Sequence, residues 1–306
     1  MNLFKRRTLV LLTGTLLTGL ALAQTAPVRV GSKIDTEGKL LGNMIVLALE
    51  AGGIKTENKS SLGNTKVMRG AITAGEIDIY PEYTGNGAFI FADESNPAWK
   101  NAKAGYERVK ALDFEKNKIV WLAPSPANNT WAIAVRKDVA AAHQLKTLDD
   151  LGKWVSAGGQ FKLAASAEFV ERSDALPAFQ TAYGFKLQPA QLLTLAGGDT
   201  AATIRAAAEK TSGVNAAMAY GTDGPVAALG LVIMDDPKGV QPIYAPAPLV
   251  RNDVLTKNPK ITTILAPVFA ALDGPTLQAL NAKIQIEGQD AKKVAGDFLK
   301  SKGLIK

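Results

Sequence analysis

Short apolar runs alternate with helix-like segments along most of this chain, and that alternation limits the possible folds more than any other feature. Residues 28–31, 77–80, 131–135 and 214–220 have the length and composition of strands, whereas residues 38–50 carry apolar side chains at helical spacing. Strands separated by helices favour largely parallel sheets covered on both faces. At 306 residues the chain is long enough for two such units, so the sequence predicts two α/β lobes.

Prolines mark two places where we expect the chain to change direction. Pro81 is predicted to end the strand 77–80, which leaves residues 82–87 in a glycine-punctuated turn. The run 240–244 is predicted to be a further strand, and the chain beyond Pro248 is predicted to be mainly helical.

The N-terminus has the pattern of an export signal. Basic residues at positions 5–7 precede the apolar run 9–22, and a small-x-small cleavage site ends at Ala23. This pattern predicts a secretory signal peptide over residues 1–23 and a freely soluble, periplasmic mature protein. No cysteine follows the cleavage site, so a lipoprotein anchor is not available.

Composition excludes several classes of protein. The chain has no cysteine and a single histidine, His143, so it offers no thiolate nucleophile, no Ser-His-Asp triad and no Cys or His metal site. We therefore predict no metal and no cofactor. Without residues 1–23, which hold three of the 35 basic residues and no acid, the net charge is +4, from 32 basic and 28 acidic residues. The lysines are scattered, and this argues against a nucleic-acid partner.

Aromatic residues next to predicted strand ends suggest a binding site. Tyr83, Tyr220 and Tyr244 each stand at or near a strand end beside Gly, Pro or Thr, and Trp131 begins a strand after a polar turn. Ligand sites of open α/β sheets form where strands release such groups. Converging aromatic faces attract a cation that has no hydrogen-bond donors, such as a quaternary ammonium group.

Two basic residues are candidates for holding the opposite end of a ligand. Lys33 and Arg172 lie in loops that follow predicted strands. Either side chain can bind a carboxylate, and Arg does so through two parallel hydrogen bonds.

Several segments, in matching order, resemble the osmoprotectant-binding family, and in particular the periplasmic YehZ/OsmF-type branch of glycine betaine-binding proteins. The resemblance spans essentially the whole mature chain. The segments are VGSKIDTEGKLLGNM, GNTKVMRGAITAGEIDIYPEYTGNG, PANNTWAIAVR, ASAEFVERSDALPAFQTAYGF, MAYGTDG and PIYAPAPLVR.

This resemblance implies a type II periplasmic binding protein. Such a protein has two α/β lobes joined by a hinge, closes on its ligand in the cleft between the lobes, and delivers that ligand to the membrane permease of an ABC importer. The family pattern implies a monomer in which lobe one comprises residues 28–128 and 242–306 and lobe two comprises residues 129–241.

The resemblance also assigns the binding residues. It implies that the ligand carboxylate is held by Lys33, Asn86 and Arg172. It also implies an aromatic cage for the cation, formed by Tyr83, Trp131, Tyr220 and Tyr244. Trp131 stands where better-known members have tyrosine, and Asn86 stands where they have threonine. Trp keeps a cation–π face, whereas the longer side chain of Asn changes the pocket.

Three functions remain open on the sequence alone. The protein is either a receptor for glycine betaine or a similar quaternary ammonium zwitterion, or a receptor for another small zwitterion such as an amino acid. The third reading is an exported enzyme that uses Glu82, Glu168 and Asp223 for acid–base chemistry.

Overall fold

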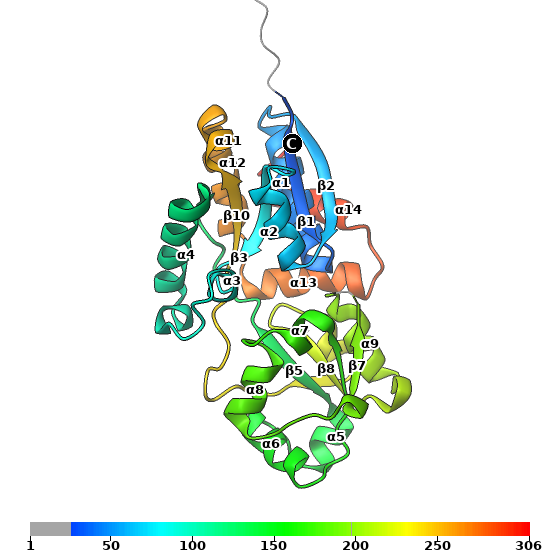
Figure 1. The fold of residues 1–306 in the computed structure, drawn as a ribbon. Coiled ribbons are helices and arrows are strands. Elements are labelled where there is room, and N and C mark those ends of the chain that lie inside the picture. Colours follow the sequence, from blue (N-terminus) through cyan, green and yellow to red (C-terminus); the bar gives the residue numbers. More distant parts are fainter. Residues whose placement is uncertain (1–25, 197) are drawn as a thin grey trace, which may run out of the picture.

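The computed structural model describes residues 26–196 and 198–306, which form two lobes, one above the other in Figure 1. The predicted signal peptide, residues 1–23, lies outside the described residues. The strands of the first lobe are β1 (Val28–Lys33), β2 (Thr56–Gly63), β3 (Ile79–Tyr83), β4 (Ile119–Trp121) and β10 (Pro246–Arg251). The strands of the second lobe are β5 (Trp131–Arg136), β6 (Leu163–Ser166), β7 (Leu192–Leu195), β8 (Ala216–Tyr220) and β9 (Leu231–Ile233).

The two sheets share one topology. The first runs in the order β2-β1-β3-β10-β4 and the second in the order β7-β6-β8-β5-β9. In each sheet the fourth strand in this order is antiparallel to both of its neighbours, and the other paired strands are parallel. The prediction of two α/β units with largely parallel strands is therefore confirmed.

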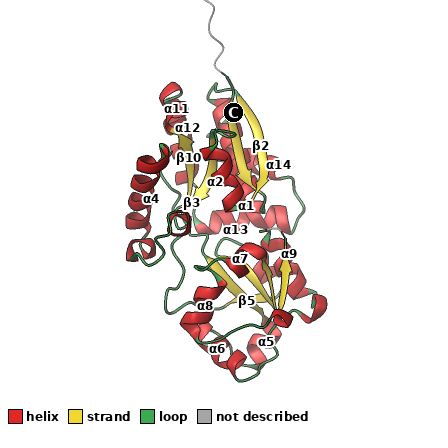
Figure 2. Ribbon diagram, viewed as in Figure 1, coloured by secondary structure: helices red, strands yellow, loops and turns green. Residues whose placement is uncertain are grey.

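Helices surround both sheets, as Figure 2 shows in red around the yellow strands. Those of the first lobe are α1 (Thr36–Ala51), α2 (Thr65–Thr73), α3 (Asn86–Ile90), α4 (Ala102–Asn117), α11 (Asn252–Lys257), α12 (Lys260–Ala270), α13 (Gly274–Gln285) and α14 (Ala291–Ser301), with a 3-10 turn at Pro97–Lys100. Those of the second are α5 (Lys137–Ala142), α6 (Leu148–Ser156), α7 (Ala167–Glu171), α8 (Leu176–Tyr183), α9 (Thr200–Ala208) and α10 (Pro225–Ala228), with 3-10 turns at Pro189–Gln191 and Thr211–Gly213. Within these described residues, no single helix has the length and apolar character needed to cross a membrane.

Helix α1 illustrates how the sequence sets an element that positions the site. Its N-cap is Asp35, whose side chain accepts a hydrogen bond of 2.7 Å from the backbone N–H of Gly38. Leu41 and Ile45 on the apolar face are completely buried, and each contributes about 1.5–3 kcal/mol through removal from water. The cap and the apolar face together fix the rotation of α1, which places Glu37 of its first turn inside the protein.

Pro81 and Pro248 lie within strands, whereas the sequence predicted that strand structure would end at these residues. Strand β3 does not end at Pro81 but continues to Tyr83, because β10 pairs with it in antiparallel register and sets Pro248 opposite Pro81. Proline has no N–H, so two facing prolines leave no unpaired donor in the ladder. The prediction of mainly helical structure beyond Pro248 is wrong for residues 249–251, which continue β10.

The predicted strand 240–244 is also wrong, because this segment forms a crossing between the lobes. The chain passes to the second sheet through residues 122–130 and returns through residues 234–245. The two crossings lie side by side, since the N–H of Asn129 donates to the carbonyl oxygen of Tyr244 at 2.9 Å. The exact lobe boundaries at 128/129 and 241/242 stay a prediction.

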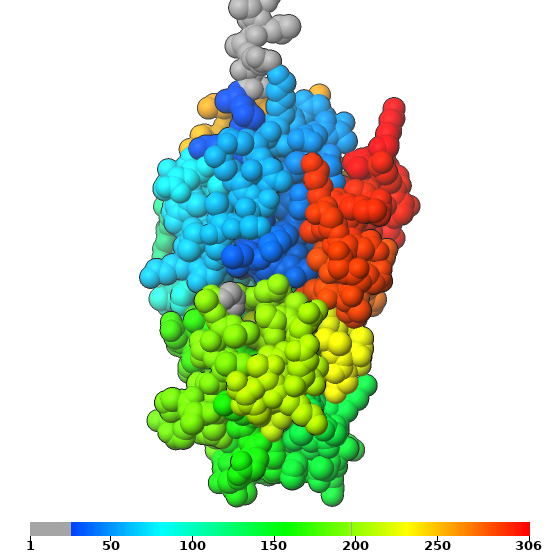
Figure 3. All heavy atoms as spheres, turned by 90° about the vertical axis from the view of Figure 1, so that its right-hand side faces the viewer, coloured from blue at the N-terminus to red at the C-terminus, as the bar shows by residue number. Residues whose placement is uncertain are grey.

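The lobes contact each other along a seam at α13. In Figure 3 the orange and red C-terminal helices rest against the yellow segment of the second lobe. Gly224 comes so close to α13 that a Cβ at this position would lie 2.4 Å from the carbonyl oxygen of Gln278. This approach requires glycine, although the backbone of Gly224 is in an ordinary helical conformation.

Candidate ligand-binding site

Side chains from both lobes and from the crossings line a narrow cavity of about 30 Å³. This volume suffices for on the order of two water-sized spheres. The lining residues are Lys33, Ile34, Asp35, Asn64, Thr65, Tyr83, Asn86, Asn129, Trp131, Glu168, Gly198, Tyr220 and Tyr244.

Four aromatic residues converge on this cavity because of where their strands end. Trp131 begins β5 and faces Tyr220, the last residue of β8, with the two rings stacked at a centroid distance of 6.4 Å. The ring of Tyr244, in the returning crossing, lies 5.8 Å from that of Trp131. Tyr83 ends β3 and lines the same cavity.

The tyrosine hydroxyls of the cavity differ in their partners. The hydroxyl of Tyr83 donates to Glu37 Oε1 at 3.0 Å, whereas that of Tyr244 is buried and has no hydrogen-bond partner among the described residues. Burial raises the pKa of both phenols, so both are neutral at physiological pH. The unpaired hydroxyl of Tyr244 is thus free to bind a ligand oxygen.

Lys33 enters the site from the end of β1 and is almost completely buried. Its Nζ lies 2.6 Å from Glu82 Oε1 and 4.9 Å from the centroid of the Tyr83 ring. Glu82 also accepts hydrogen bonds from Asn86 Nδ2 at 2.7 Å and from the Tyr80 hydroxyl at 3.1 Å. The buried ammonium group is therefore compensated by a carboxylate, as a charge in this position requires.

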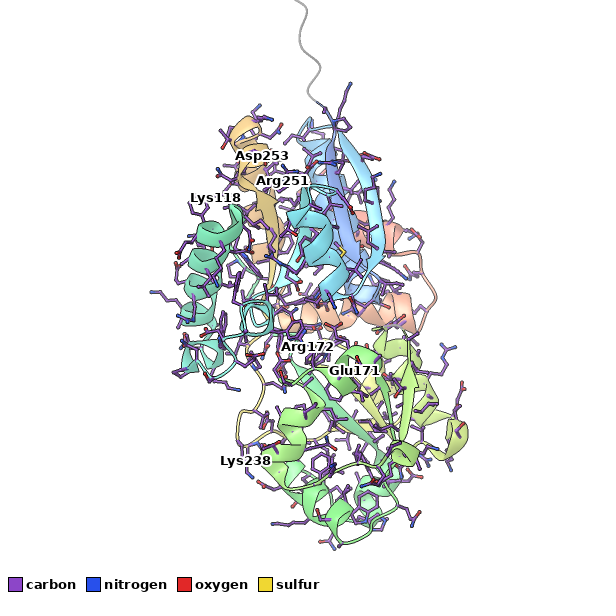
Figure 4. The ribbon with its side chains drawn as sticks, viewed as in Figure 1. Lys118, Glu171, Arg172, Lys238, Arg251 and Asp253 are labelled. Atoms are coloured by element: carbon purple, nitrogen blue, oxygen red, sulfur yellow. The ribbon has the colours of Figure 1, made fainter. Side chains whose placement is uncertain are left out.

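Arg172 lies at the junction of the lobes, where Figure 4 labels it. Its Nε and NH2 donate to Asp174 at 2.9 and 2.7 Å, and its NH1 donates to Asn86 Oδ1 at 2.9 Å and to Glu168 Oε1 at 3.1 Å. Burial lowers the pKa of Arg172, but the hydrogen bonds to Asp174 and the electrostatic interactions with Tyr244, Asp174 and Glu168 together outweigh burial, so the pKa is raised and the guanidinium stays charged.

The guanidinium of Arg172 also contacts two aromatic faces. Its central carbon lies 4.5 Å from the ring centroid of Trp131 and 4.1 Å from that of Phe89. Arg172 therefore connects the first lobe, through Phe89 and Asn86, with the second lobe, through Trp131 and Asp174.

Of the seven binding residues expected from sequence, six line the cavity and the seventh, Arg172, contacts two of them. The sequence did not indicate Phe89, although it follows Asn86 by three residues and so lies on the same side of α3. It also did not indicate Asp35 or Glu37, which lie shortly after Lys33 at the start of α1.

The carboxylates that the enzyme reading required have structural partners. Glu82 is completely buried and paired with Lys33, while Asp223 accepts hydrogen bonds from the Tyr220 N–H at 2.7 Å and the Thr200 hydroxyl at 2.8 Å. Only Glu168 of the three lines the cavity. Burial raises the pKa of Asp223 to about 7.

Each of the two sheets has this strand order with one antiparallel inserted strand. Two adjacent crossings join the sheets, and a cavity lies between them. These features define a type II periplasmic binding protein. The family comparison agrees, because residues 26–301 match the substrate-binding domain of ABC-type glycine betaine transport systems. The chain therefore belongs to this family of substrate-binding proteins. The enzyme reading is wrong, since the family consists of binding proteins.

Individual relatives support the assignment. The chain is 67% identical over 287 residues to glycine betaine-binding protein YehZ of Escherichia coli strain K12, covering 94% of each chain. It is 32% identical to a glycine-betaine-binding protein of Pseudomonas aeruginosa, covering 100% of this chain and 96% of that protein. The structure of apo YehZ from Escherichia coli covers 91% of this chain and 99% of its own, with a TM-score of 0.67.

Proposed function

We propose that this protein binds glycine betaine or a closely related quaternary ammonium zwitterion in the periplasm and delivers it to the permease of an ABC importer. The observation that carries this proposal is the convergence of Tyr83, Trp131, Tyr220 and Tyr244 on one cavity between the lobes. The names of the relatives support the choice of ligand, because two of them are glycine betaine-binding proteins.

The four rings suit a trimethylammonium group. This cation has no N–H to donate, so it needs aromatic faces and negative charge rather than hydrogen-bond acceptors. Each ring face contributes about 0.5–2 kcal/mol, and the larger value applies where water is excluded. Asp35 and Glu168 line the same cavity and favour a positive ligand there.

The ligand carboxylate is assigned to Lys33, Asn86 and Arg172, with Tyr244 as an additional donor. Arg172 uses four of its five N–H donors in hydrogen bonds with the protein, so one donor remains for a ligand. The buried hydroxyl of Tyr244 supplies a second donor close to Trp131.

Binding requires a change in the walls of the cavity. A zwitterion with three methyl groups on nitrogen needs more space than about 30 Å³ provides, so we propose that the lobes part to admit it. The hinge consists of the two crossings, and the rigid bodies are residues 28–128 plus 242–306 and residues 129–241. The ligand shifts the equilibrium toward the closed form by its higher affinity for that form.

Export and delivery complete the proposal. The N-terminal pattern over residues 1–23 predicts cleavage near Ala23 and release into the periplasm. Family membership supports a membrane permease as the partner, and we propose that a single copy of the closed protein docks on it.

Calorimetry tests the choice of ligand. The exported protein should be titrated with glycine betaine, proline betaine, choline, carnitine, ectoine and proline. We expect the betaines to bind and proline to bind at least tenfold more weakly, because a secondary ammonium needs acceptors, the rings supply none, and Asp35 and Glu168 already accept hydrogen bonds from Gly38 and Arg172. Tighter binding of proline or another amino acid would replace this function with the amino-acid receptor.

A further inference from the structure

Glu37 is a buried carboxylate that accepts hydrogen bonds from both lobes. It is only 5% exposed and forms no ion pair within residues 26–196 and 198–306. Its Oε1 accepts from the Tyr83 hydroxyl at 3.0 Å and from Asn129 Nδ2 at 2.9 Å, and its Oε2 accepts from the Thr222 hydroxyl and from Asn281 Nδ2, both at 2.6 Å. Hydrogen bonds replace the cation that normally accompanies a buried carboxylate.

The four donors come from separate parts of the chain. Tyr83 belongs to the sheet of the first lobe, Asn129 to a crossing, Thr222 to the loop after β8 in the second lobe, and Asn281 to α13. Asn281 also donates to the backbone carbonyl of Thr222 at 3.1 Å. Gln278, one turn earlier on α13, donates to the carbonyl oxygen of Gly221 at 2.9 Å. The loop of the second lobe is thus held to the first lobe around one carboxylate.

The partners of Glu37 depend on the arrangement of the lobes. Separation of the lobes would remove Thr222, the donor that belongs wholly to the second lobe, and would admit water to Glu37. Hydrogen bonds to a charged acceptor are stronger than neutral ones when water is excluded. The network therefore has different contacts in the closed and open arrangements, which is what a conformational switch needs.

We propose that Glu37 is a positioning residue that holds the lobes closed on the ligand and fixes the ring of Tyr83. Glu37 does not line the cavity, so it acts through Tyr83 and the loop at Thr222. The part that concerns Tyr83 rests on the proposed function, in which this ring contacts the cation. Donation of the phenol hydrogen to a carboxylate makes the ring face more negative and so strengthens its attraction for a cation.

Substitutions of Thr222 test the proposal with little change in volume. Thr222→Val removes the hydroxyl that donates across the lobes, and Thr222→Ser restores it. Thr203→Val is the matched control, because the Thr203 hydroxyl is equally buried but donates to the carbonyl oxygen of Met218 within the second lobe at 2.7 Å. Glu37→Gln removes the charge, and Tyr83→Phe removes only the donor within the first lobe.

The readouts are the radius of gyration from small-angle X-ray scattering and the dissociation constant for glycine betaine, both on the exported protein. We expect Thr222→Val and Glu37→Gln to enlarge the radius without ligand and to weaken binding about tenfold. Thr222→Ser should match the parent. Thr203→Val should lower the unfolding temperature but change neither readout, and Tyr83→Phe should weaken binding without enlarging the radius.

The outcomes separate this proposal from the choice of ligand. Equal radii for Thr222→Val, Thr203→Val and the parent would overturn the closing role of Glu37, even if Glu37→Gln failed to fold. If the parent bound no quaternary ammonium compound, the proposed function would fail, while the radius without ligand would still decide whether the network holds the lobes together.

Discussion

The contacts of Arg172 restrict how a ligand carboxylate can bind in the site. Its guanidinium lies against Phe89 and Trp131 and is bound to Asp174, so little of it is free to move. The side-chain amide of Asn86 also has two hydrogen bonds within the protein, because its Nδ2 donates to Glu82 and its Oδ1 accepts from Arg172. A ligand carboxylate in this region must therefore compete with hydrogen bonds that already exist within the protein.

Replacement of Arg172 by lysine should change selectivity. Lysine keeps the positive charge but loses the planar group that binds two oxygens and stacks on Trp131. We expect glycine betaine to bind about tenfold or more weakly, whereas choline, which has no carboxylate, should lose less. The measurement is the ratio of the two dissociation constants by calorimetry. Equal losses for both ligands would indicate that Arg172 acts only by joining the lobes.

Tyr220 gives a test of the aromatic cage. Tyr220→Phe retains the ring face and should bind nearly as the parent does, whereas Tyr220→Ala should bind about 3–30-fold more weakly. Tyr106→Ala is the matched control, because Tyr106 is also partly buried but packs against a hydrophobic cluster away from the cavity. The cage would be misplaced if Tyr220→Ala and Tyr106→Ala had the same affinity.

At the level of elements, the sequence was most informative where local signals act alone. The helix predicted over residues 38–50 agrees with the structure, in which α1 spans Thr36–Ala51. Errors arose where the pairing of strands decides the extent of an element. Strand β3, for example, continues beyond Pro81 because β10 pairs with it. Residues 240–244 have strand composition, but their N–H groups donate to Asp236, Trp99 and Asn128 rather than to a neighbouring strand.

The same distinction applies to the site. Tyr83, Trp131 and Tyr220 were predictable because strand ends carry them. Glu37 was not, because a carboxylate in the first turn of a helix is ordinarily a solvated charge that favours the helix dipole. Its burial depends on Asn281, which is 244 residues away in the chain, and no local pattern contains that contact.

Two glycines provide a matched test of the seam between α13 and the second lobe. Gly224→Ala places a methyl group 2.4 Å from the carbonyl oxygen of Gln278 and 2.7 Å from Ala282 Cβ, so it should push the lobes apart and weaken ligand binding. Gly70→Ala, in α2, meets nothing within 4 Å and should stabilise the protein by about 0.5–1 kcal/mol. The radius of gyration from scattering and the ligand affinity from calorimetry should be measured for both variants. Equal values for Gly224→Ala and Gly70→Ala would show that close packing at the seam does not hold the lobes together.

At the scale of the whole molecule, buried acids set the pH dependence of stability. Burial raises the pKa of Asp223 to about 7 and also raises the pKa values of Asp35 and Glu37. A carboxyl group with a raised pKa binds its proton more tightly in the folded protein than in the unfolded chain. Its contribution to stability is therefore full below the unfolded pKa of about 4 and is lost as pH rises toward the folded pKa.

We expect the free energy of unfolding to fall between pH 5 and about 7, at up to about 1.4 kcal/mol per pH unit for each proton involved. Asp223→Asn should make this dependence shallower. The opposite slope appears only at lower pH, where Asp93 and Asp150, whose pKa values are lowered by hydrogen bonds from Arg108 and from the Thr147 N–H, become protonated. Urea unfolding at several pH values measures the slope, and greater stability at pH 7.5 than at pH 5 would contradict the prediction.

The narrowness of the cavity has a kinetic consequence. A cavity of about 30 Å³ has no room for a zwitterion with three methyl groups, so the walls have to move apart before a ligand can enter, and release by the same route needs the same motion. Ligands of different affinity then share one upper limit on their dissociation rate, and that limit belongs to the protein. A permease that prises the two lobes apart would raise this limit, and so could empty the site at a rate that spontaneous opening does not reach.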